Sequence, residues 1–349
     1  MCIRDSVYNW QAALDQFRSS PLFGTGGGTH LYYGRYFRRP PLQSDPIHAH
    51  SDYLELLAEY GVIGAIGMAA FLCVHLASGW RNYRTVLRRE LSDLPEWQRA
   101  GNNSLALYIG ALCAISAYLA HSVTDFNLHV PGHALIFAFI FGAIASPVYG
   151  PAPERVARSP LIFRWPLAAL GIWLFIAFLL LFPNEYWTER ARVALRNLDF
   201  PASISAAEQA LTFDDRNPEL FFHLGGALRG SAIVAEDEET RVKSLNAAVD
   251  AYYRGLALFP QDVHMLIRCA QTLGVLGRFK EAENLYRSAI VLDRNFGRLH
   301  AYYARHLALV GRDEEAEAAF ERAKSLDHSP ETIAIVRGTS LDPDAANAG

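Results

Sequence analysis

The chain has 349 residues, a formal net charge of −4 and a hydrophobic fraction of 51%. This length has room for two domains, and the balance of charge gives no indication of a nucleic-acid partner. A mean hydropathy of +0.06 is unusual for one globular protein and indicates an average over a membrane half and a soluble half. The four cysteines, Cys2, Cys73, Cys113 and Cys269, lack the spacing of a disulfide framework or a zinc site.

The start of the chain contains segments of different kinds. Residues 1–6 resemble translated sequencing-adapter sequence, so we expect a non-native artefact there. A helix with one apolar face follows from Val7 and ends before Pro21. The glycine-rich run 24–28 either forms a flexible connection, which we favour, or a nest of backbone N–H groups that binds phosphate. Residues 32–46 contain Arg35, Arg38 and Arg39 and are interpreted as an ordered loop.

Residues 48–64 concentrate ionisable side chains directly before an apolar segment. His48 and His50 precede three acids, Asp52, Glu55 and Glu59. Either Ser51 or Asp52 can cap a helix here, and acids in its first turn are favourable at the positive end of the helix. His50 is therefore expected just before a helix N-terminus, which is a suitable position for chemistry on an anion.

Four apolar segments follow, and each approaches the ~20 residues that a bilayer-spanning helix needs. They are Val62–Ser78, Leu105–Val123, Gly132–Tyr149 and Trp165–Pro183. The first two contain histidine and are rather short, so a buried helix of a soluble protein is the alternative for each. Four such segments in succession favour a membrane.

Arginine-rich segments separate the first span from the second and the third from the fourth. They contain Arg81, Arg84, Arg88, Arg89 and Arg99, and then Arg155, Arg158 and Arg164. The loop 124–131 has no Lys or Arg. The positive-inside rule places both arginine-rich segments in the cytoplasm, so His50 and the residues after Phe182 are expected on the outer side.

A repeat of 34 residues occupies the second half of the chain. Gly277, Ala282, Tyr286 and Ala289 recur as Gly311, Ala316, Phe320 and Ala323. This pattern resembles tetratricopeptide repeats, pairs of helices that stack into a solenoid with a concave face. A preceding unit around Tyr252 and a degenerate one between Arg192 and Pro218 complete the array. Tyr286 and Phe320 are interpreted as core residues.

Three stretches, residues 21–28, 48–64 and 121–131, together resemble the O-antigen ligase/polymerase superfamily of bacterial membrane proteins. The resemblance covers roughly residues 7–150, and it implies a C-terminal fragment fused to the tetratricopeptide repeats. It further implies transfer of a glycan from a polyprenyl-diphosphate carrier to an acceptor hydroxyl, without a metal or another cofactor. The acceptor is a lipid, as in O-antigen ligases, a growing glycan, as in polymerases, or a protein.

The resemblance also assigns residues to this reaction. His50 matches the motif histidine and is expected to act as the base. Arg35 lies at about the spacing of a phosphate-binding arginine, and the neighbouring Arg38 and Arg39 are alternatives. Supporting roles, either in catalysis or as helix caps and structural hydrogen bonds, are expected for Asp52, Tyr53, His121 and Asp125. A metal pair of His48 with His50 lacks an evident third ligand. Family members have Asn where this chain has Ser51.

These observations predict an all-α protein of polytopic membrane helices followed by a repeat solenoid. Its parts are an artefact at 1–6, a periplasmic loop region with the histidine motif at 7–61, four transmembrane helices at 62–183, repeats at 184–338 and a disordered tail at 339–349. The expected location is the bacterial inner membrane, with the His50 loop and the repeats in the periplasm. The expected partners are membrane lipid and a protein bound to the repeats. Two other function classes remain open, a bicarbonate-type transporter and a membrane-anchored scaffold.

Overall fold

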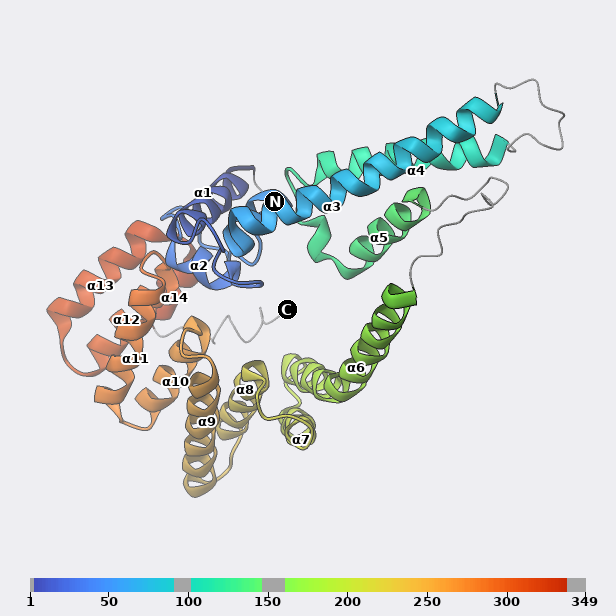
Figure 1. Ribbon diagram of the computed structural model, residues 1–349. Coiled ribbons are helices and arrows are strands. Elements are labelled where there is room, and N and C mark those ends of the chain that lie inside the picture. Colours follow the sequence, from blue (N-terminus) through green and yellow to red (C-terminus); the bar gives the residue numbers. More distant parts are fainter. Residues whose placement is uncertain (1–2, 91–101, 146–160, 338–349) are drawn as a thin grey trace. The chain divides into compact units, whose positions relative to one another are not determined.

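The computed structural model describes residues 3–90, 102–145 and 161–337, which excludes the expected tail at 339–349. The described residues form helices and no strand, and this confirms the predicted all-α class (Figure 1). In chain order they are α1 (Ile3–Ser19), α2 (His30–Tyr36), α3 (Asp52–Glu90), α4 (Asn102–His121), the 3-10 turn η2 (Asn127–His129), α5 (Pro131–Ala145), α6 (Leu161–Arg196), α7 (Phe200–Leu211), α8 (Pro218–Ile233), α9 (Glu238–Leu258), α10 (Val263–Val275), α11 (Phe279–Leu292), α12 (Gly297–Leu309), α13 (Asp313–Leu326) and α14 (Pro330–Arg337).

The chain divides into two compact units, residues 1–159 and residues 160–349. The first unit contains α1 to α5 and the histidine motif, and the second contains α6 and the repeats. The division therefore falls between the third and the fourth of the predicted spans.

Two described helices are long and apolar enough to cross a bilayer, at Asp52–Arg88 and Ala168–Arg196. The first contains the whole of the first predicted span, and the second contains the fourth predicted span from Ala168 onwards. The second and third predicted spans correspond to shorter apolar helices, Leu105–His121 and Pro131–Ala145, and residues 146–149 lie outside the described part of the chain. Arg81, Arg84 and Arg88 belong to the end of α3, whereas Arg99, Arg155 and Arg158 are among the residues left undescribed.

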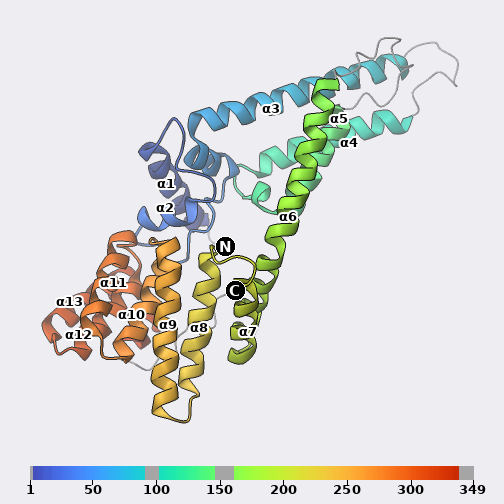
Figure 2. The ribbon, with the colours of Figure 1, turned by 60° about the horizontal axis from the view of Figure 1, so that its bottom comes forward.

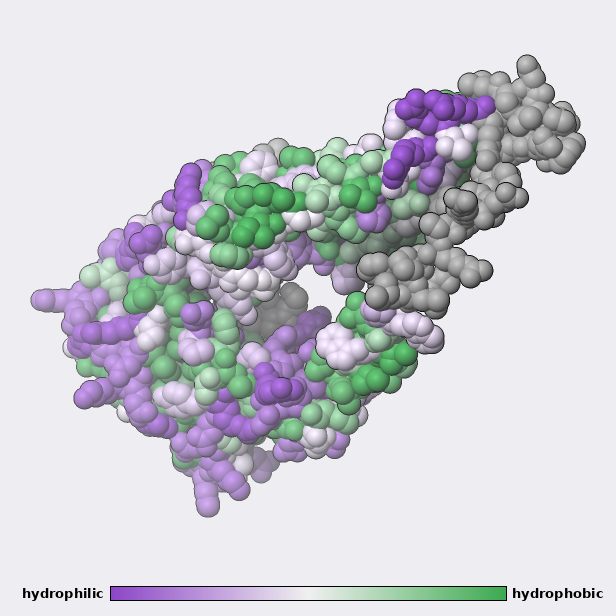
Figure 3. All heavy atoms as spheres, in the orientation of Figure 1, coloured by the Kyte–Doolittle hydropathy of each residue, from purple (hydrophilic) through white to green (hydrophobic). Residues whose placement is uncertain are grey.

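The apolar side chains of these helices are buried against one another in some places and exposed in others. In the first unit α3, α4 and α5 pack around Tyr108, Ile115, Phe137 and Phe141. On α6, by contrast, the apolar residues between Leu170 and Phe182 are mostly half or more exposed. A long run of exposed apolar side chains is typical of a surface that contacts lipid. Figure 3 shows hydrophobic surface, in green, on α6 and along α3.

Helix α3 is interrupted at Gly61, whose φ of 65° lies in the left-handed region. The glycine-rich loop 21–28 fills this break with four backbone hydrogen bonds. They run from Thr25 N to Ala58 O (3.1 Å), from Gly26 N to Glu59 O (2.9 Å), from Val62 N to Pro21 O (2.9 Å) and from Ile63 N to Leu22 O (3.2 Å). The loop is therefore an ordered clasp on α3, and the N–H groups of Thr25 and Gly26 are used within the protein.

The second unit is an array of antiparallel helix pairs, α8 with α9, α10 with α11 and α12 with α13 (Figures 1 and 2). Aspartate or asparagine side chains cap the N-termini of α8, α9 and α10. Gly277 and Gly311 both have positive φ, at 74° and 76°, where each pair turns. Tyr252 and Tyr286 are buried in the core, and Phe320 is half-buried. The 34-residue spacing therefore corresponds to one helix pair.

Candidate functional site

The candidate site lies where α3 begins. His48 and His50 belong to the loop before α3, three acids occupy its first two turns, and the segment between α4 and α5 supplies Asp125 and His129. Asp52, Glu55 and Glu59 have exposed fractions of only 2–3%. Their spacing of three and four residues puts them on one face of the helix.

His50 is held in an uncommon backbone conformation, with φ at 55°. Its carbonyl oxygen accepts a 2.9 Å hydrogen bond from Trp10 Nε1. The imidazole ring makes an edge-to-face contact with the ring of Phe126, with 5.3 Å between the ring centroids. The buried Nδ1 has no hydrogen-bond partner among the described residues. Burial lowers the pKa of His50 below its usual value, partly opposed by the negative charge of Asp125. The imidazole is therefore neutral near pH 7 and has a free nitrogen.

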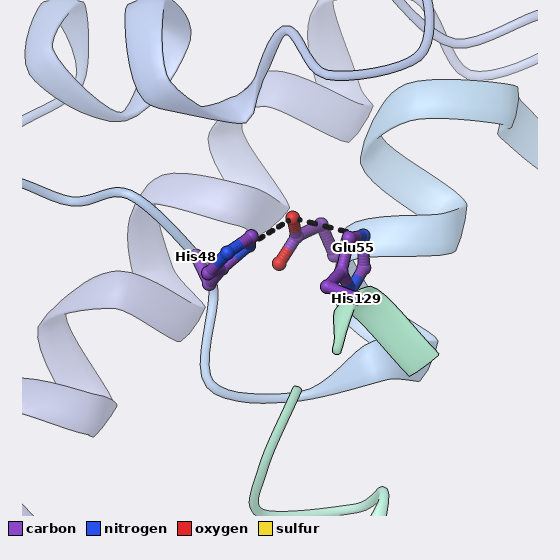
Figure 4. Close-up of side chains that lie close together, drawn as sticks. All are labelled: His48, Glu55 and His129. Atoms are coloured by element: carbon purple, nitrogen blue, oxygen red, sulfur yellow. Dashed lines mark hydrogen bonds and ion pairs between the residues drawn. The ribbon is translucent and has the colours of Figure 1, made fainter. Parts of the chain in front are cut away.

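Glu55 joins three segments (Figure 4). Its Oε1 lies 3.0 Å from His48 Nδ1 and 3.2 Å from His129 Nε2. Its Oε2 accepts a 2.8 Å hydrogen bond from the N–H of Ala49. The carboxylate thus contacts both residues that precede His50, and it fixes the loop that carries the histidine.

Asp52 holds the segment between α4 and α5. Its carboxylate accepts hydrogen bonds from Leu128 N, at 3.2 Å, and from His129 Nδ1, at 3.1 Å. The bond to Asp52 raises the pKa of His129, and burial opposes it. Of the two capping candidates, Ser51 has the side chain closer to a free N–H of the first turn, with its Oγ 3.5 Å from Leu54 N.

Glu59 and His30 extend the cluster towards α2. Glu59 Oε1 accepts a 3.0 Å hydrogen bond from the backbone N–H of His30. The His30 ring is 1% exposed and contacts Gln16 Oε1 through Nδ1 at 2.8 Å. Burial lowers the pKa of His30 to about 4, so this ring is neutral. No motif in the sequence pointed to His30.

The three arginines differ in how they are engaged. Arg38 is fully buried and donates to the carbonyls of Leu42, at 3.1 Å, and Ser44, at 2.6 Å. Arg35 is nearly buried and pairs with Asp45 at 3.2 Å. Arg39 pairs with Asp15, and 40% of its side chain is exposed. Arg38 therefore stabilises its own loop and is not available to a ligand, whereas Arg39 is the most accessible.

The remaining predicted residues lie at the edge of the site. Tyr53 donates a 2.8 Å hydrogen bond to Leu119 O. His121 is exposed, and its Nδ1 lies 3.7 Å from a carboxylate oxygen of Asp125. The carboxylate of Asp125 also accepts a hydrogen bond from the N–H of Phe126. Its backbone carbonyl accepts a hydrogen bond from the N–H of Asp52 at the start of α3. These contacts hold neighbouring segments together. Of these three residues, only Asp125 also raises the pKa of His50 through its charge.

A cavity of about 250 Å³ opens beside the cluster. Most of its wall is apolar and comes from α3, α4 and α5, with Phe71, Phe137 and Phe141 among the lining residues. Asp52, Glu59 and His129 also line it. One part of the cavity wall is therefore apolar, and another part carries the carboxylates of Asp52 and Glu59.

The sequence pointed to part of this arrangement. It identified His48, His50 and the acids, but it did not pair His129 with Glu55, because those residues are 74 positions apart. The spacing of Asp52, Glu55 and Glu59 was the available signal, since it predicts one acidic helix face that needs partners.

Comparison with solved structures finds similarity for the helical repeats. A thermophilic TPR protein from Thermus thermophilus is 19% identical, with 47% of this chain and 80% of that chain covered and a TM-score of 0.39. MamA AMB-1 is 23% identical, with coverages of 42% and 99% and a TM-score of 0.24. MamA MSR-1 is also 23% identical, with coverages of 42% and 97% and a TM-score of 0.25. The repeat assignment rests on the helix pairs and their spacing.

No curated protein matches the chain. The model of one protein family, described as O-antigen ligase, matches residues 6–69. This stretch contains α1, the glycine-rich clasp, the arginine-bearing loop and the His50 motif with the start of α3. The chain is therefore similar to O-antigen ligases over the segment that builds most of the site, and this similarity supports an enzyme of the ligase or glycosyltransferase type in general.

Proposed function

We propose that the protein transfers a glycan from a polyprenyl-diphosphate carrier to an acceptor hydroxyl. The observation that carries the proposal is the match of residues 6–69 to the O-antigen ligase family. This stretch contains His50, whose neutral imidazole lies directly before α3. An apolar helix adjacent to the site is consistent with a lipid-linked donor.

His50 acts as the general base in this proposal. Its Nε2 accepts the proton of the acceptor hydroxyl, because Nδ1 is buried. At the same time the hydroxyl oxygen attacks the anomeric carbon of the donor sugar, and the bond from that carbon to the diphosphate breaks. Glu55 positions the base through Ala49 and His48. Asp125 stabilises the imidazolium that forms, because its negative charge is the one that most raises the pKa of His50.

The departing diphosphate needs cations, and Arg39 is the best candidate. Its side chain is 40% exposed, against 7% for Arg35 and 0% for Arg38, and Asp15 is its ion-pair partner. Guanidinium groups bind phosphate oxygens through two parallel hydrogen bonds. Arg35 is the second choice, because only 7% of its side chain is exposed. Arg38 is excluded from this role by its burial.

We also propose a multi-pass location in the bacterial inner membrane, with the His50 loop and the repeats in the periplasm. The two long apolar helices and the arginines at the end of α3 support this orientation. The repeats are then available to a protein partner of the assembly machinery, which is the usual role of such arrays.

The proposal is tested with membranes from cells that express the protein. They receive a fluorescent polyprenyl-diphosphate-linked glycan together with one of three acceptors: lipid A core, an oligosaccharide or a protein. We expect one acceptor to become labelled while polyprenyl diphosphate is released, in proportion to the amount of protein. Release without a labelled acceptor, or activity equal to that of membranes without the protein, contradicts the proposal. The labelled acceptor distinguishes ligase, polymerase and protein glycosylation.

A further inference from the structure

The cluster of His48, Glu55 and His129 has the chemistry of a metal site. Its three potential ligand atoms are imidazole Nδ1, carboxylate Oε1 and imidazole Nε2, and none of their separations exceeds 4.8 Å. They come from the loop before α3, from α3 and from η2 (Figure 4). Two imidazoles and one carboxylate are a set that zinc and other divalent transition metals accept, with a further coordination position left open.

The distances fit such an ion closely. Tetrahedral zinc with bonds of about 2.1 Å places its ligand atoms roughly 3.4 Å apart. The two separations that involve Glu55 Oε1 are 3.0 Å and 3.2 Å. The separation of the two imidazole nitrogens does not exceed 4.8 Å, and it is the one that shortens when an ion binds.

Charge gives an independent reason for a cation. Asp52, Glu55 and Glu59 are all buried on one face of α3. Among the described residues none of these carboxylates forms an ion pair with Arg or Lys, and their partners are backbone N–H groups and histidines. Buried carboxylates need compensating charge. A divalent cation supplies two positive charges to this face of α3.

The surroundings of His129 match those of a metal ligand. Its Nδ1 contacts Asp52 Oδ1 at 3.1 Å, which directs Nε2 towards Glu55. A carboxylate behind the distal nitrogen is the usual support of a metal-bound histidine, because it fixes the tautomer and the ring orientation. His129 and Asp52 also line the apolar cavity, so an open coordination position at the ion is accessible from it.

We propose that His48, Glu55 and His129 bind one divalent transition-metal ion, with zinc as the best fit, and that Asp52 orients His129. The ion ties the His50 loop and η2 to the start of α3. This proposal departs from the metal-free reaction that the family resemblance implies, and it does not depend on the proposed glycan transfer.

Metal binding is measured on the full chain purified in detergent and stripped with a chelator. Zn²⁺ is titrated in competition with a chromophoric chelator, and Co²⁺ is added in parallel as a visible probe. We expect about one equivalent bound per chain, with the absorption bands of four- or five-coordinate Co²⁺. His129→Ala and Glu55→Gln should abolish this binding, and Asp52→Asn should weaken it about 10–100-fold. His133→Ala, which changes an exposed histidine on α5, should bind as the wild type does.

A gain-of-signal variant keeps the test decisive if alanine variants fold poorly. His48→Cys supplies a thiolate ligand, so its Co²⁺ complex should gain an intense near-ultraviolet charge-transfer band. A wild-type chain that binds neither ion, ligand variants that bind as tightly as His133→Ala, or a His48→Cys complex without the thiolate band each overturns the proposal. The first result means that protons, not a metal, balance the buried carboxylates. Glycan transfer is read separately, so either proposal can fail alone.

Discussion

At the scale of single residues, side chains of the same type differ in function because they differ in burial. Arg38 and Arg39 are neighbours in the chain, yet one is fully buried and the other is substantially exposed. The sequence indicated an arginine-bearing loop but not which arginine faces inward. Residues 37–51 form neither helix nor strand, so no regular spacing predicts which side chains point to the interior. His50 was identifiable from its motif, whereas the contact of His129 with Glu55 depends on tertiary packing.

We expect Arg38 to be a stability residue. Arg38→Lys removes the planar group that bonds the carbonyls of Leu42 and Ser44 and leaves buried acceptors unsatisfied, at a cost of about 3–5 kcal/mol. Arg39→Lys should cost much less, because that side chain is partly solvated. Thermal unfolding of both variants in the same detergent is the measurement. Equal melting temperatures for the two variants contradict this assignment.

At the scale of elements, the break in α3 and its clasp could not be derived from the sequence alone. The glycine-rich run suggested a connection or a phosphate nest, and the apolar pattern suggested a helix from Val62. The sequence does not show that these two segments complete each other's hydrogen bonds at Gly61. For the second and third expected spans, the described residues contain the shorter apolar helices Leu105–His121 and Pro131–Ala145.

We expect the break at Gly61 to require glycine. Its φ is 65°, and an added Cβ would lie 2.4 Å from Leu22 O, so Gly61→Ala strains the backbone and displaces the clasp. Gly67→Ala is the matched control, because nothing lies within 4 Å of its added Cβ on the same helix. Limited proteolysis within residues 20–30 should accelerate only in Gly61→Ala. Equal cleavage in both variants shows that the clasp does not depend on this glycine.

At the scale of the whole molecule, the sequence predicted the all-α class and the repeat period, because both follow from local helical patterns. The side of the membrane on which the repeats lie stays a prediction. Charge bias alone supports it, and several of the arginines that carry this bias lie outside the described residues.

We expect the repeats to share a compartment with His50. Asp313 is exposed at the start of α13, so Asp313→Cys in a chain without Cys2, Cys73, Cys113 and Cys269 presents one accessible thiol. A maleimide that crosses the outer but not the inner membrane should label it in intact cells. Labelling that requires lysis of the inner membrane places the repeats in the cytoplasm and removes them from the catalytic side.

The central claim is that His50 is the base of a glycan transfer. Replacing it removes proton abstraction but none of the contacts that Glu55 makes with Ala49 and His48. The direct measurement is the rate of glycan transfer by membranes with equal amounts of wild-type, His50→Ala and His133→Ala protein. We predict a fall of about 10²- to 10⁴-fold for His50→Ala and an unchanged rate for His133→Ala. A His50→Ala protein that transfers glycan at the wild-type rate contradicts the account.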